Sequence, residues 1–362
     1  MVDEDIHSSM ALPDPLRVRG RLFAWPDSVE TTRQLAAAAS ECDCRIEAFE
    51  EYECVALHLA AERGVWVLDT IRKGLSDQAL RNTRVVFKAG DDEPTLADFP
   101  RSDSLTTFIA FARSQWLGDM MGSGRLAAWF QPIVDVHSPR RVVAVEALAR
   151  GQDLAQNWIL PNRLLSAARD SGQLASFDQY VHERAIAAFD LPAPVALFLN
   201  VDPRTLEAPE LDLERILRAA ARQGLDPRRI TLELVECETI RDMVRVQDVL
   251  TEARSLGFGI ALDDMGAGYS NLNLMHELRP DVVKLDMSLT RDVTSDPYKA
   301  VIVEKMLETT RRLGVRTVAE GVERPAELAW LQAHQVDYVQ GFLIGRPAPE
   351  ATTLRPASSL SA

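Results

Sequence analysis

The chain has 362 residues and a formal charge of −14 at pH 7, because 54 acidic residues outnumber 40 lysines and arginines, and 46% of its residues are apolar. This length is enough for two domains, and the apolar fraction excludes a disordered chain. No run approaches the ~20 apolar residues of a membrane-spanning helix, and the acidic start Met1-Val2-Asp3-Glu4-Asp5 is unlike a secretory signal. We therefore expect a cytoplasmic protein without a membrane span.

The cysteine content argues against a disulfide-rich or zinc-knuckle protein, and the charge argues against a protein that binds nucleic-acid polymers. The four cysteines, Cys42, Cys44, Cys54 and Cys237, are too few and too clustered for a disulfide framework, and no pair has zinc-knuckle spacing. We expect reduced thiols. The acidic balance disfavours binding to a nucleic-acid polymer, which rewards clustered Lys and Arg, but it does not exclude a small phosphate ligand held through metal ions.

The first third of the chain predicts a small α/β domain. Residues 1–18 are polar with two prolines and are interpreted as a flexible leader. In residues 19–103, strand-like runs near Leu22–Trp25, Ile46, Val65–Leu68 and Val85–Phe87 alternate with helical stretches at Val29–Cys42 and Tyr52–Glu62. This alternation predicts a parallel sheet. Residues 104–123 are expected to form a connecting helix, helical by periodicity over Ser104–Met120.

Residues 124–350 repeat one theme, and residues 351–362 are expected to form a tail. Apolar, strand-length runs occur eight times, at Leu126–Val134, Val142–Leu148, Val195–Val201, Ile230–Val235, Phe258–Leu262, Val282–Leu285, Val315–Ala319 and Val336–Val339. Helical stretches separate them from the second run onward, which predicts a modified TIM (β/α)₈ barrel. Because Asp135–Arg141 is too short for a parallel crossover, the first strand should be antiparallel to the second.

Polar residues gather at or just past the ends of these runs, where barrel enzymes place their chemistry. They are Glu146, Asn200, Glu233 with Glu236, Asp263 with Asp264, Lys284 with Asp286, Glu320 with Glu323, and Gln340. Like charges crowded at one mouth repel unless they are protonated or bridged by cations. Carboxylates plus one amide suit Mg²⁺ or Mn²⁺, and none of the six histidines lies at a strand end to recruit zinc.

The pattern also indicates a phosphodiester ligand. The adjacent pair Asp263-Asp264 allows one carboxylate to bridge two metal ions, the recurring arrangement for in-line attack of hydroxide on a phosphodiester. Lys284 offers a fixed cation to orient water or neutralise developing charge. Arg150 is placed to reach a phosphate oxygen, and Gly266-Ala267-Gly268 predicts a mobile loop beside the acidic pair.

These residues, taken in order, resemble the EAL family of cyclic di-GMP phosphodiesterases over about residues 125–349. Gln131-Pro132-Ile133-Val134-Asp135 is similar to the opening motif, and Glu146-Ala147-Leu148 is the tripeptide that gives the family its name. Each tripeptide alone is weak evidence, but the ordered series is specific. The resemblance implies hydrolysis of cyclic di-GMP to linear pGpG with two Mg²⁺ or Mn²⁺ ions. The alternative is a catalytically silent receptor that binds cyclic di-GMP and signals through protein contacts.

The resemblance also implies a role for each residue. One metal ion would be held by Glu146, Asn200, Glu233 and Asp263, and the other by Asp263 and Asp264. The catalytic set would comprise Lys284, which orients water, Glu320 as a ligand or base, Glu323 as a supporting carboxylate near Lys284, and Gln340 as their partner. The nucleotide would contact Gln131, Leu148 and Arg150. Coupling to dimerisation through the barrel would use Glu236 and the loop containing Gly266, Gly268 and Tyr269.

The N-terminal domain is interpreted as a regulatory module. Its alternation and Asp69, which follows the run Val65–Leu68, resemble a response-regulator receiver, in which such an aspartate accepts phosphate. The sequence lacks the usual acidic pair and is one strand short. An unmodified interaction or sensory domain is the preferred interpretation, with a protein partner. A third hypothesis makes this domain the main output, with the barrel tuning its partner.

Overall fold

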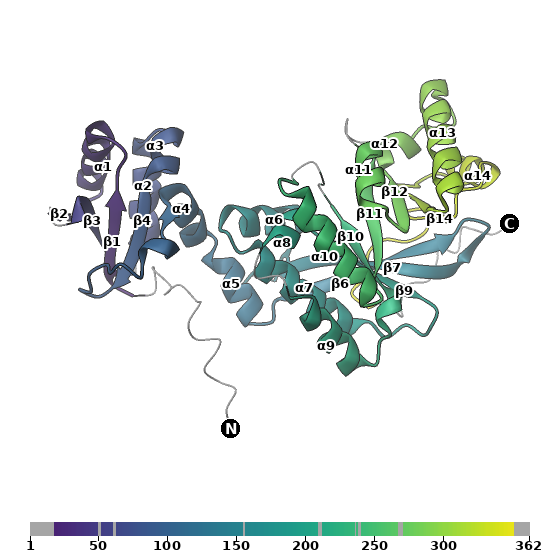
Figure 1. Cartoon of the computed structure of the whole chain (residues 1–362), viewed down its shortest axis with the longest axis horizontal. Coiled ribbons are helices and arrows are strands. Elements are labelled where there is room, and N and C mark those ends of the chain that lie inside the picture. Colours follow the sequence, from purple (N-terminus) through teal and green to yellow (C-terminus); the bar gives the residue numbers. More distant parts are fainter. Residues whose placement is uncertain are drawn as a thin grey trace. The chain divides into compact units, whose positions relative to one another are not determined.

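The computed structural model describes residues 18–49, 52–60, 63–154, 156–208, 212–235, 237, 240–266 and 271–350. Contacts divide the chain into two compact units, Met1–Asp119 with Ser166–Gln173, and Met120–Leu165 with Leu174–Ala362. Figure 1 colours the chain from purple in the first unit to yellow at the end of the second. Among the described residues, no helix combines the length and apolar character needed to cross a membrane.

The first unit is built on an antiparallel sheet. Its strands have the order β2-β3-β1-β4-β5, and every pairing is antiparallel. The strands are β1 (Gly20–Trp25), β2 (Ile46–Phe49), β3 (Cys54–Leu59), β4 (Arg84–Ala89) and β5 (Asp103–Ser104). The helices are α1 (Val29–Glu41), α2 (Gly64–Gly74), α3 (Asp77–Asn82), α4 (Leu105–Arg113) and the 3₁₀ turn η2 (Phe99–Arg101).

Alternation along β1 gives this sheet two apolar faces. Leu22 and Ala24 join the core that includes buried side chains of α1 and α2, whereas Phe23 packs with Cys54 and Ala56 in a second cluster. Successive side chains of a strand point to opposite faces, so β1 is buried on both. The predicted small α/β domain is therefore confirmed as an α/β unit.

The predicted parallel sheet is wrong. The run Val65–Leu68 lies in helix α2, and most of the helix expected over Tyr52–Glu62 is strand β3. Asp69 consequently lies on a helix, with its Oδ1 3.4 Å from Arg113 Nε, and not at the end of a strand as a receiver requires. Four apolar residues in a row fit a strand or a buried helix turn equally well, which explains the error.

The connecting segment is also different from the prediction. The single helix expected over Ser104–Met120 is two helices, α4 and α5 (Gln115–Gly122), because α4 ends at Arg113 with Ser114 as its C-cap. The Ser114 amide donates to the Phe111 carbonyl at 3.0 Å, a tight final turn that closes the first helix before the second begins.

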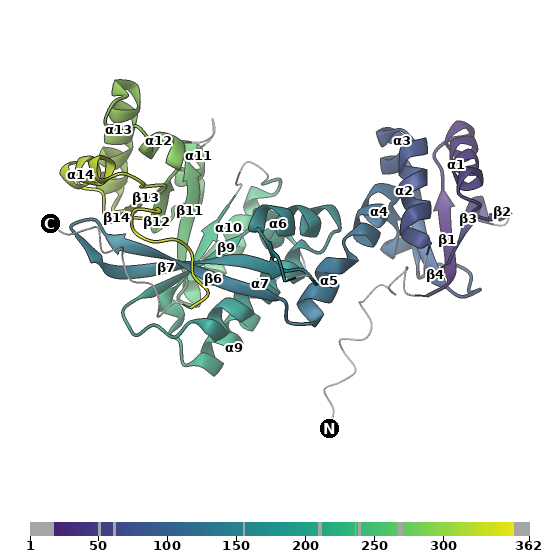
Figure 2. The same cartoon turned by 180° about the vertical axis from the view of Figure 1, so that it is seen from behind.

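The second unit is the predicted barrel. Its eight strands are β6 (Leu126–Asp135), β7 (Ser138–Gln152), β9 (Ala196–Val201), β10 (Ile230–Leu234), β11 (Gly259–Met265), β12 (Val282–Leu285), β13 (Arg316–Ala319) and β14 (Tyr338–Val339). They pair in the order β6-β14-β13-β12-β11-β10-β9-β7, and β6 also pairs with β7, which closes the barrel. Strand β6 is antiparallel to both neighbours, so the predicted hairpin is confirmed; Figure 2 shows it from behind.

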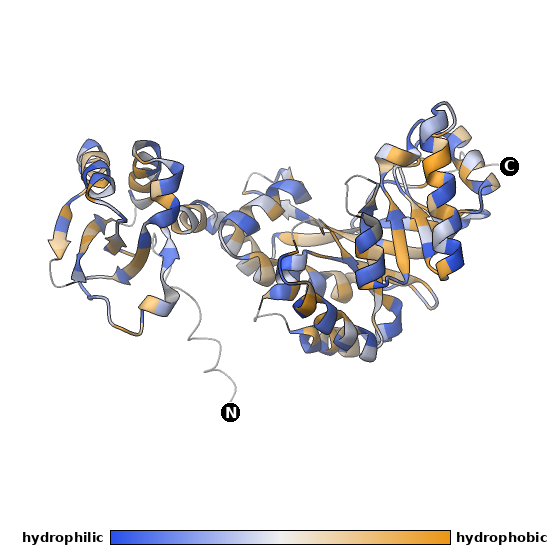
Figure 3. Cartoon of the chain, turned by 45° about the horizontal axis from the view of Figure 1, so that its top comes forward, coloured by the Kyte–Doolittle hydropathy of each residue, from blue (hydrophilic) through white to orange (hydrophobic). Residues whose placement is uncertain are grey.

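Helices follow most of the parallel strands. They are α6 (Pro161–Asp170), α7 (Leu174–Ala188), α8 (Pro203–Glu207), α9 (Leu213–Gln223), α10 (Met243–Ser255), α11 (Asn271–Leu278), α12 (Met287–Thr290), α13 (Pro297–Leu313) and α14 (Pro325–Ala333), with the 3₁₀ turn η3 (Pro227–Arg229) and the short strand β8 (Trp158–Ile159). Figure 3 shows largely apolar barrel strands and helices with hydrophilic stripes. The main core lies between these two layers.

A smaller apolar cluster fills one end of the barrel interior. It consists of Ile133, Ala144, Phe198, Ala261, Val282 and Val318. Because strand side chains alternate with a period of two, the residue two positions further along each strand also faces inward. In the parallel strands this position lies toward the carboxyl end, where the barrel therefore presents whatever residue the sequence places there.

Candidate active site

The inward positions beyond the apolar cluster carry the central residues of the predicted site. Glu146, Asn200, Asp263, Lys284 and Glu320 each lie two residues after a member of the cluster. Glu233 pairs with Asn200 in strand register, and its side chain is fully buried. The structure therefore brings these side chains together at the carboxyl ends of the strands.

Lys284 lies at the centre of the acidic side chains, with 1% of its side chain exposed. Its Nζ lies 3.2 Å from Glu146 Oε2, 2.6 Å from Glu320 Oε1 and 3.6 Å from Asp263 Oδ1. It also donates a hydrogen bond to Glu233 Oε1. Four carboxylates thus share one ammonium group, which leaves an excess of negative charge if every group is ionised.

Two amides hold the Glu146 carboxylate. Asn200 Nδ2 donates to Oε1 at 2.9 Å, and Gln340 Nε2 donates to Oε2 at 2.7 Å. Burial raises the pKa of Glu146, but the charge of Lys284 and these amide bonds outweigh burial, so its pKa lies below the usual value. Gln340 also donates to Gln131 Oε1 at 3.2 Å, which joins the antiparallel strand to the site.

The other carboxyl groups have raised pKa values. Burial is the main cause for Glu233, whose pKa is well above its usual value, and for Asp263, with neighbouring carboxylates adding to it. Burial likewise raises the pKa of Glu320 to about 8 although Lys284 opposes it. Burial lowers the pKa of Lys284, but its four acidic neighbours outweigh burial and raise that pKa well above its usual value. Without a further cation, this cluster holds protons that isolated carboxyl groups would lose.

Several buried oxygens of the cluster have no hydrogen-bond donor among the described residues. They include Asn200 Oδ1, Glu233 Oε2 and Asp263 Oδ1, although the last faces Lys284 at 3.6 Å. Leaving a buried acceptor without a donor is costly, and a hard cation satisfies such oxygens. Carboxylate oxygens of Glu146, Glu233 and Glu320 lie within 4.8 Å of one another, as do those of Asp263, Asp264 and Glu320. The donor set therefore fits Mg²⁺ or Mn²⁺.

Predicted nucleotide-contacting residues lie on the paired strands β6 and β7. Arg150 lies four residues after Glu146 on the same face of β7, and only 8% of it is exposed. Its guanidinium carbon lies 5.4 Å from the ring centroid of Trp129, and Nη1 donates to the Ala149 carbonyl at 2.8 Å. Leu148, between Glu146 and Arg150, pairs with Trp129 in register. Burial lowers the pKa of Arg150, and the charge of Glu146 acts in the opposite direction.

The remaining predicted residues lie outside the group that contacts Lys284 or outside the described part of the chain. Glu323 forms an ion pair with Arg291 at 2.9 Å and is not among the four carboxylates that contact Lys284. Gly266 has a positive φ of 108°, and a Cβ there would lie against Leu289. Glu236, Gly268 and Tyr269 lie outside the described residues.

His182 is a site neighbour that the sequence analysis missed. It lies on α7, is 2% exposed, and its Nε2 is 2.8 Å from the carbonyl oxygen of Asn200. Burial lowers the pKa of His182. Its position on a buried helical face is the only sequence signal, and that signal does not distinguish a polar contact from ordinary packing.

A TIM-like barrel with an oxygen-rich, cation-suited cluster at the carboxyl ends of its strands defines the class of the second unit. Within that class, the family model of the EAL domain matches residues 114–347, and the chain belongs to this family.

Named relatives and solved structures cover the same region. A cyclic di-GMP phosphodiesterase of Pseudomonas aeruginosa is 32% identical over 222 residues, which are 60% of this chain and 38% of that protein. A probable cyclic di-GMP phosphodiesterase of Escherichia coli K12, PdeN, is 29% identical over 230 residues, 61% of this chain and 43% of that protein. The chain thus covers less than half the length of either relative.

Two solved structures of EAL proteins resemble the barrel of this chain. The PaMucR phosphodiesterase in its c-di-GMP complex has a TM-score of 0.60 and 28% identity, covering 66% of this chain and 98% of that one. A standalone EAL protein from Vibrio cholerae O395, in its c-di-GMP bound form, has a TM-score of 0.56 and 32% identity, covering 62% and 92%.

Proposed function

We propose that the barrel hydrolyses cyclic di-GMP to linear pGpG with two Mg²⁺ or Mn²⁺ ions. The observation that carries the proposal is the buried carboxylate cluster around Lys284, with acceptor oxygens that lack donors, in an EAL domain. Relatives named as cyclic di-GMP phosphodiesterases support the choice of substrate.

Each residue of the cluster has a distinct role in the proposed reaction. By the family resemblance, Glu146, Asn200, Glu233 and Asp263 would hold one cation, and Asp263 with Asp264 the other. In the structure, Glu320 lies within 4.8 Å both of Glu146 with Glu233 and of Asp263 with Asp264. Divalent cations bound there would acidify water and neutralise phosphate charge. Lys284 orients the attacking water, Glu320 is a ligand of the cations or the base that accepts the proton of the water, and Arg150 donates to a phosphate oxygen. The oxygen of water bonds to phosphorus as one ring P–O bond breaks, and the ribose oxygen that leaves takes up a proton from solvent, which opens the cyclic nucleotide.

The decisive experiment is a turnover assay. Purified full-length chain is incubated with cyclic di-GMP and Mg²⁺ or Mn²⁺, and the linear product is followed by chromatography. We expect product from the wild type and none from Glu146→Ala, which removes the carboxylate that Asn200, Gln340 and Lys284 hold. Glu308→Gln on α13 is the control and should retain activity.

The same assay addresses the receptor alternative. Tight binding of cyclic di-GMP without product in either metal would favour a silent receptor, and unchanged turnover by Glu146→Ala would refute the site. The presence of every acidic residue in the cluster favours the enzyme.

The protein's wider setting forms part of the proposal. We propose a homodimer through the barrel domain, supported by the exposed apolar side chains Met287, Tyr298, Val301 and Ile302 on α12 and α13. The first unit is proposed to regulate the barrel and to bind a protein partner. Four buried free thiols support a cytoplasmic location.

A further inference from the structure

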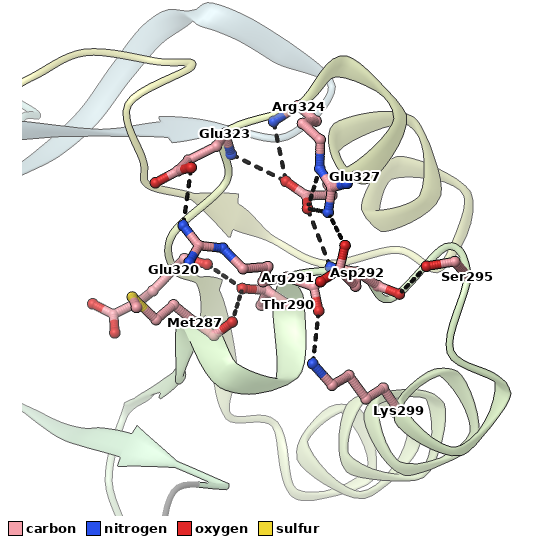
Figure 4. A network of polar contacts seen from close by, with 10 residues as sticks. All are labelled: Met287, Thr290, Arg291, Asp292, Ser295, Lys299, Glu320, Glu323, Arg324 and Glu327. Atoms are coloured by element: carbon pink, nitrogen blue, oxygen red, sulfur yellow. Dashed lines mark hydrogen bonds and ion pairs between the residues drawn. The ribbon is translucent and has the colours of Figure 1, made fainter.

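Beside the acid cluster, the barrel rim carries a second polar network, in which Glu327 of α14 is the central acceptor (Figure 4). Its side chain is 1% exposed. Oε1 accepts from the Asp292 amide at 3.2 Å and from Arg324 Nε and Nη2 at 2.9 and 2.6 Å. Oε2 accepts from the amides of Glu323 and Arg324 at 3.1 and 3.0 Å. Both oxygens of this carboxylate are therefore surrounded by donors.

These donors come from two separate rim segments. Asp292 lies at the end of the segment that follows strand β12, the strand of Lys284. Glu323 and Arg324 lie on the segment that follows β13 and begins with Glu320. Glu327 therefore ties together the segments that follow two neighbouring strands of the site.

The same segments also meet close to Glu320. Thr290 Oγ1 donates a hydrogen bond to the Glu320 carbonyl oxygen. Gly321 has a φ of +62°, and a Cβ there would lie 2.4 Å from Met287 Cβ, so the segments are too close to admit a side chain. Because they touch at Gly321 and are tied at Glu327, a shift at Glu327 displaces the backbone that carries Glu320.

The half-exposed ion pairs of this network contribute less than Glu327 to holding the two segments together. The Arg291–Glu323 pair at 2.9 Å has 44% and 41% of its side chains exposed, and the partners of the Arg324–Asp292 pair are each 51% exposed. Exposed ion pairs are weak, whereas a buried carboxylate that loses its donors leaves them unpaired. Glu327 is thus the dominant element of the network.

We propose that Glu327 is a positioning residue that holds the carboxylate of Glu320 in the metal site by joining the β12 and β13 segments. It acts through the backbone and does not itself touch the cluster carboxylates among the described residues. This inference rests on the proposed function, because Glu320 matters only if the cluster binds metal ions.

The test substitution is Glu327→Gln, which keeps the volume but turns one acceptor oxygen into a donor facing N–H groups. In one amide orientation the bonds from the Asp292 amide and the Arg324 side chain are lost, and in the other the bonds from the amides of Glu323 and Arg324 are lost. We expect kcat for cyclic di-GMP to fall about 10- to 100-fold, the usual effect of losing a partner that orients a metal ligand. KM should stay close to the wild-type value, since Arg150 and Gln131 are not on these segments.

A second variant tests the contact between the two segments next to Glu320. Thr290→Val removes the hydroxyl that bonds the Glu320 carbonyl while keeping the shape of the side chain. We expect kcat to fall in the same direction by about 2- to 10-fold, the range for one neutral hydrogen bond. Glu308→Gln is the matched control, because Glu308 pairs with Lys305 and Arg312 on α13 outside this network.

Binding of Mn²⁺, measured by calorimetry without nucleotide, separates this proposal from the proposed function. We expect weaker Mn²⁺ binding by Glu327→Gln and Thr290→Val, with the larger loss in Glu327→Gln, and wild-type binding by Glu308→Gln. If the wild type binds Mn²⁺ but does not hydrolyse cyclic di-GMP, the proposed function fails and the ranking of Mn²⁺ affinities still tests Glu327.

A purely structural role gives a different result. It would lower the melting temperature of Glu327→Gln but leave kcat per folded molecule and Mn²⁺ affinity within twofold of wild type, and that outcome would overturn the proposal. Failure of Thr290→Val to change either quantity would overturn it as well. If the wild type does not bind Mn²⁺ at all, both proposals fail.

Discussion

Lys284 is held by electrostatics that depend on all of its neighbours at once. Its ammonium group contacts Glu146, Glu233, Asp263 and Glu320, and its side chain is 1% exposed. A buried cation is tolerated when charges of opposite sign surround it, and removing one partner of such a group leaves the others unpaired. The lysine and the carboxylates are therefore best treated as one unit.

Replacement of this lysine should make stability depend more strongly on pH. In EDTA, we expect Lys284→Met to lower the free energy of unfolding by about 3–5 kcal/mol at pH 8. At that pH the buried carboxyl groups either ionise without a cation beside them or stay protonated against the pH of the solvent, and both states are costly. At pH 5 the loss should be smaller, because protonated carboxyls need no cation. Urea unfolding at both pH values measures this difference.

The control for this prediction is Lys305→Met, which removes an exposed lysine paired with Glu308. It should leave the unfolding curves at both pH values unchanged. An equal loss for Lys284→Met at pH 5 and pH 8 would show that the lysine acts through packing and not through charge.

The positions of residues were predictable where strand periodicity applies. The placement of Glu146, Asn200 and Asp263 follows from a period of two applied to apolar runs that the sequence displays. The contacts of Glu327 were not predictable, because three of its donors are backbone amides, which are not specific to a residue type, and the Asp292 amide comes from a segment distant in sequence. Glu323, which by resemblance is a supporting carboxylate near Lys284, forms its ion pair with Arg291, and its supporting role stays a prediction.

At the scale of elements, the two units differ in how much the sequence indicates. Most of the parallel barrel strands are apolar runs followed by a helix with a clear period, and Val282–Leu285 matches β12 at both ends. In the first unit, the strand β3 and the helix α2 were exchanged in the prediction, because short apolar runs such as Val65–Leu68 lack a period. The connection between β2 and β3 spans only residues 50–53, too few for a parallel crossover, and this was the signal that was overlooked.

The end of β14 depends on a glycine for its contact with the β13 segment. A Cβ on Gly341 would lie 2.2 and 2.3 Å from the Val322 backbone oxygen and nitrogen, and no rotamer change relieves a clash with backbone. We expect Gly341→Ala to lower the free energy of unfolding by about 1–3 kcal/mol and to pull Gln340 away from Glu146. Thermal unfolding and the turnover assay measure the two effects.

Gly122→Ala is the matched control for this substitution. Gly122 lies at the end of α5, and a methyl group added there would meet no atom within 4 Å, so alanine should be neutral or slightly stabilising. A Gly341→Ala protein with wild-type stability and turnover would show that the rim segments adjust freely.

At the scale of the whole molecule, burying the charged groups of the site opposes folding. The apolar cluster inside the barrel stabilises the closed sheet, whereas the carboxylates above it are buried without enough cations. Metal ions that bind only the folded state shift the folding equilibrium by mass action. The unfolding of the full chain should therefore report on site occupancy without any substrate.

The last prediction follows from the sign of the shift at Glu320. Its folded pKa of about 8 lies above the usual 4.5, so in EDTA the folded state keeps a proton that the unfolded state has lost. That stabilisation is complete below pH 4.5 and disappears as the pH rises toward 8, by at most about 1.4 kcal/mol per pH unit. Glu320→Gln cannot titrate at this position and should flatten this part of the curve of stability against pH.

Because protons and Mn²⁺ compete for the same oxygens, the increase in melting temperature caused by Mn²⁺ should be larger at pH 8 than at pH 5.5 in the wild type. Differential scanning calorimetry at both pH values decides it, since an equal increase would mean that the ions bind away from the carboxylates around Lys284.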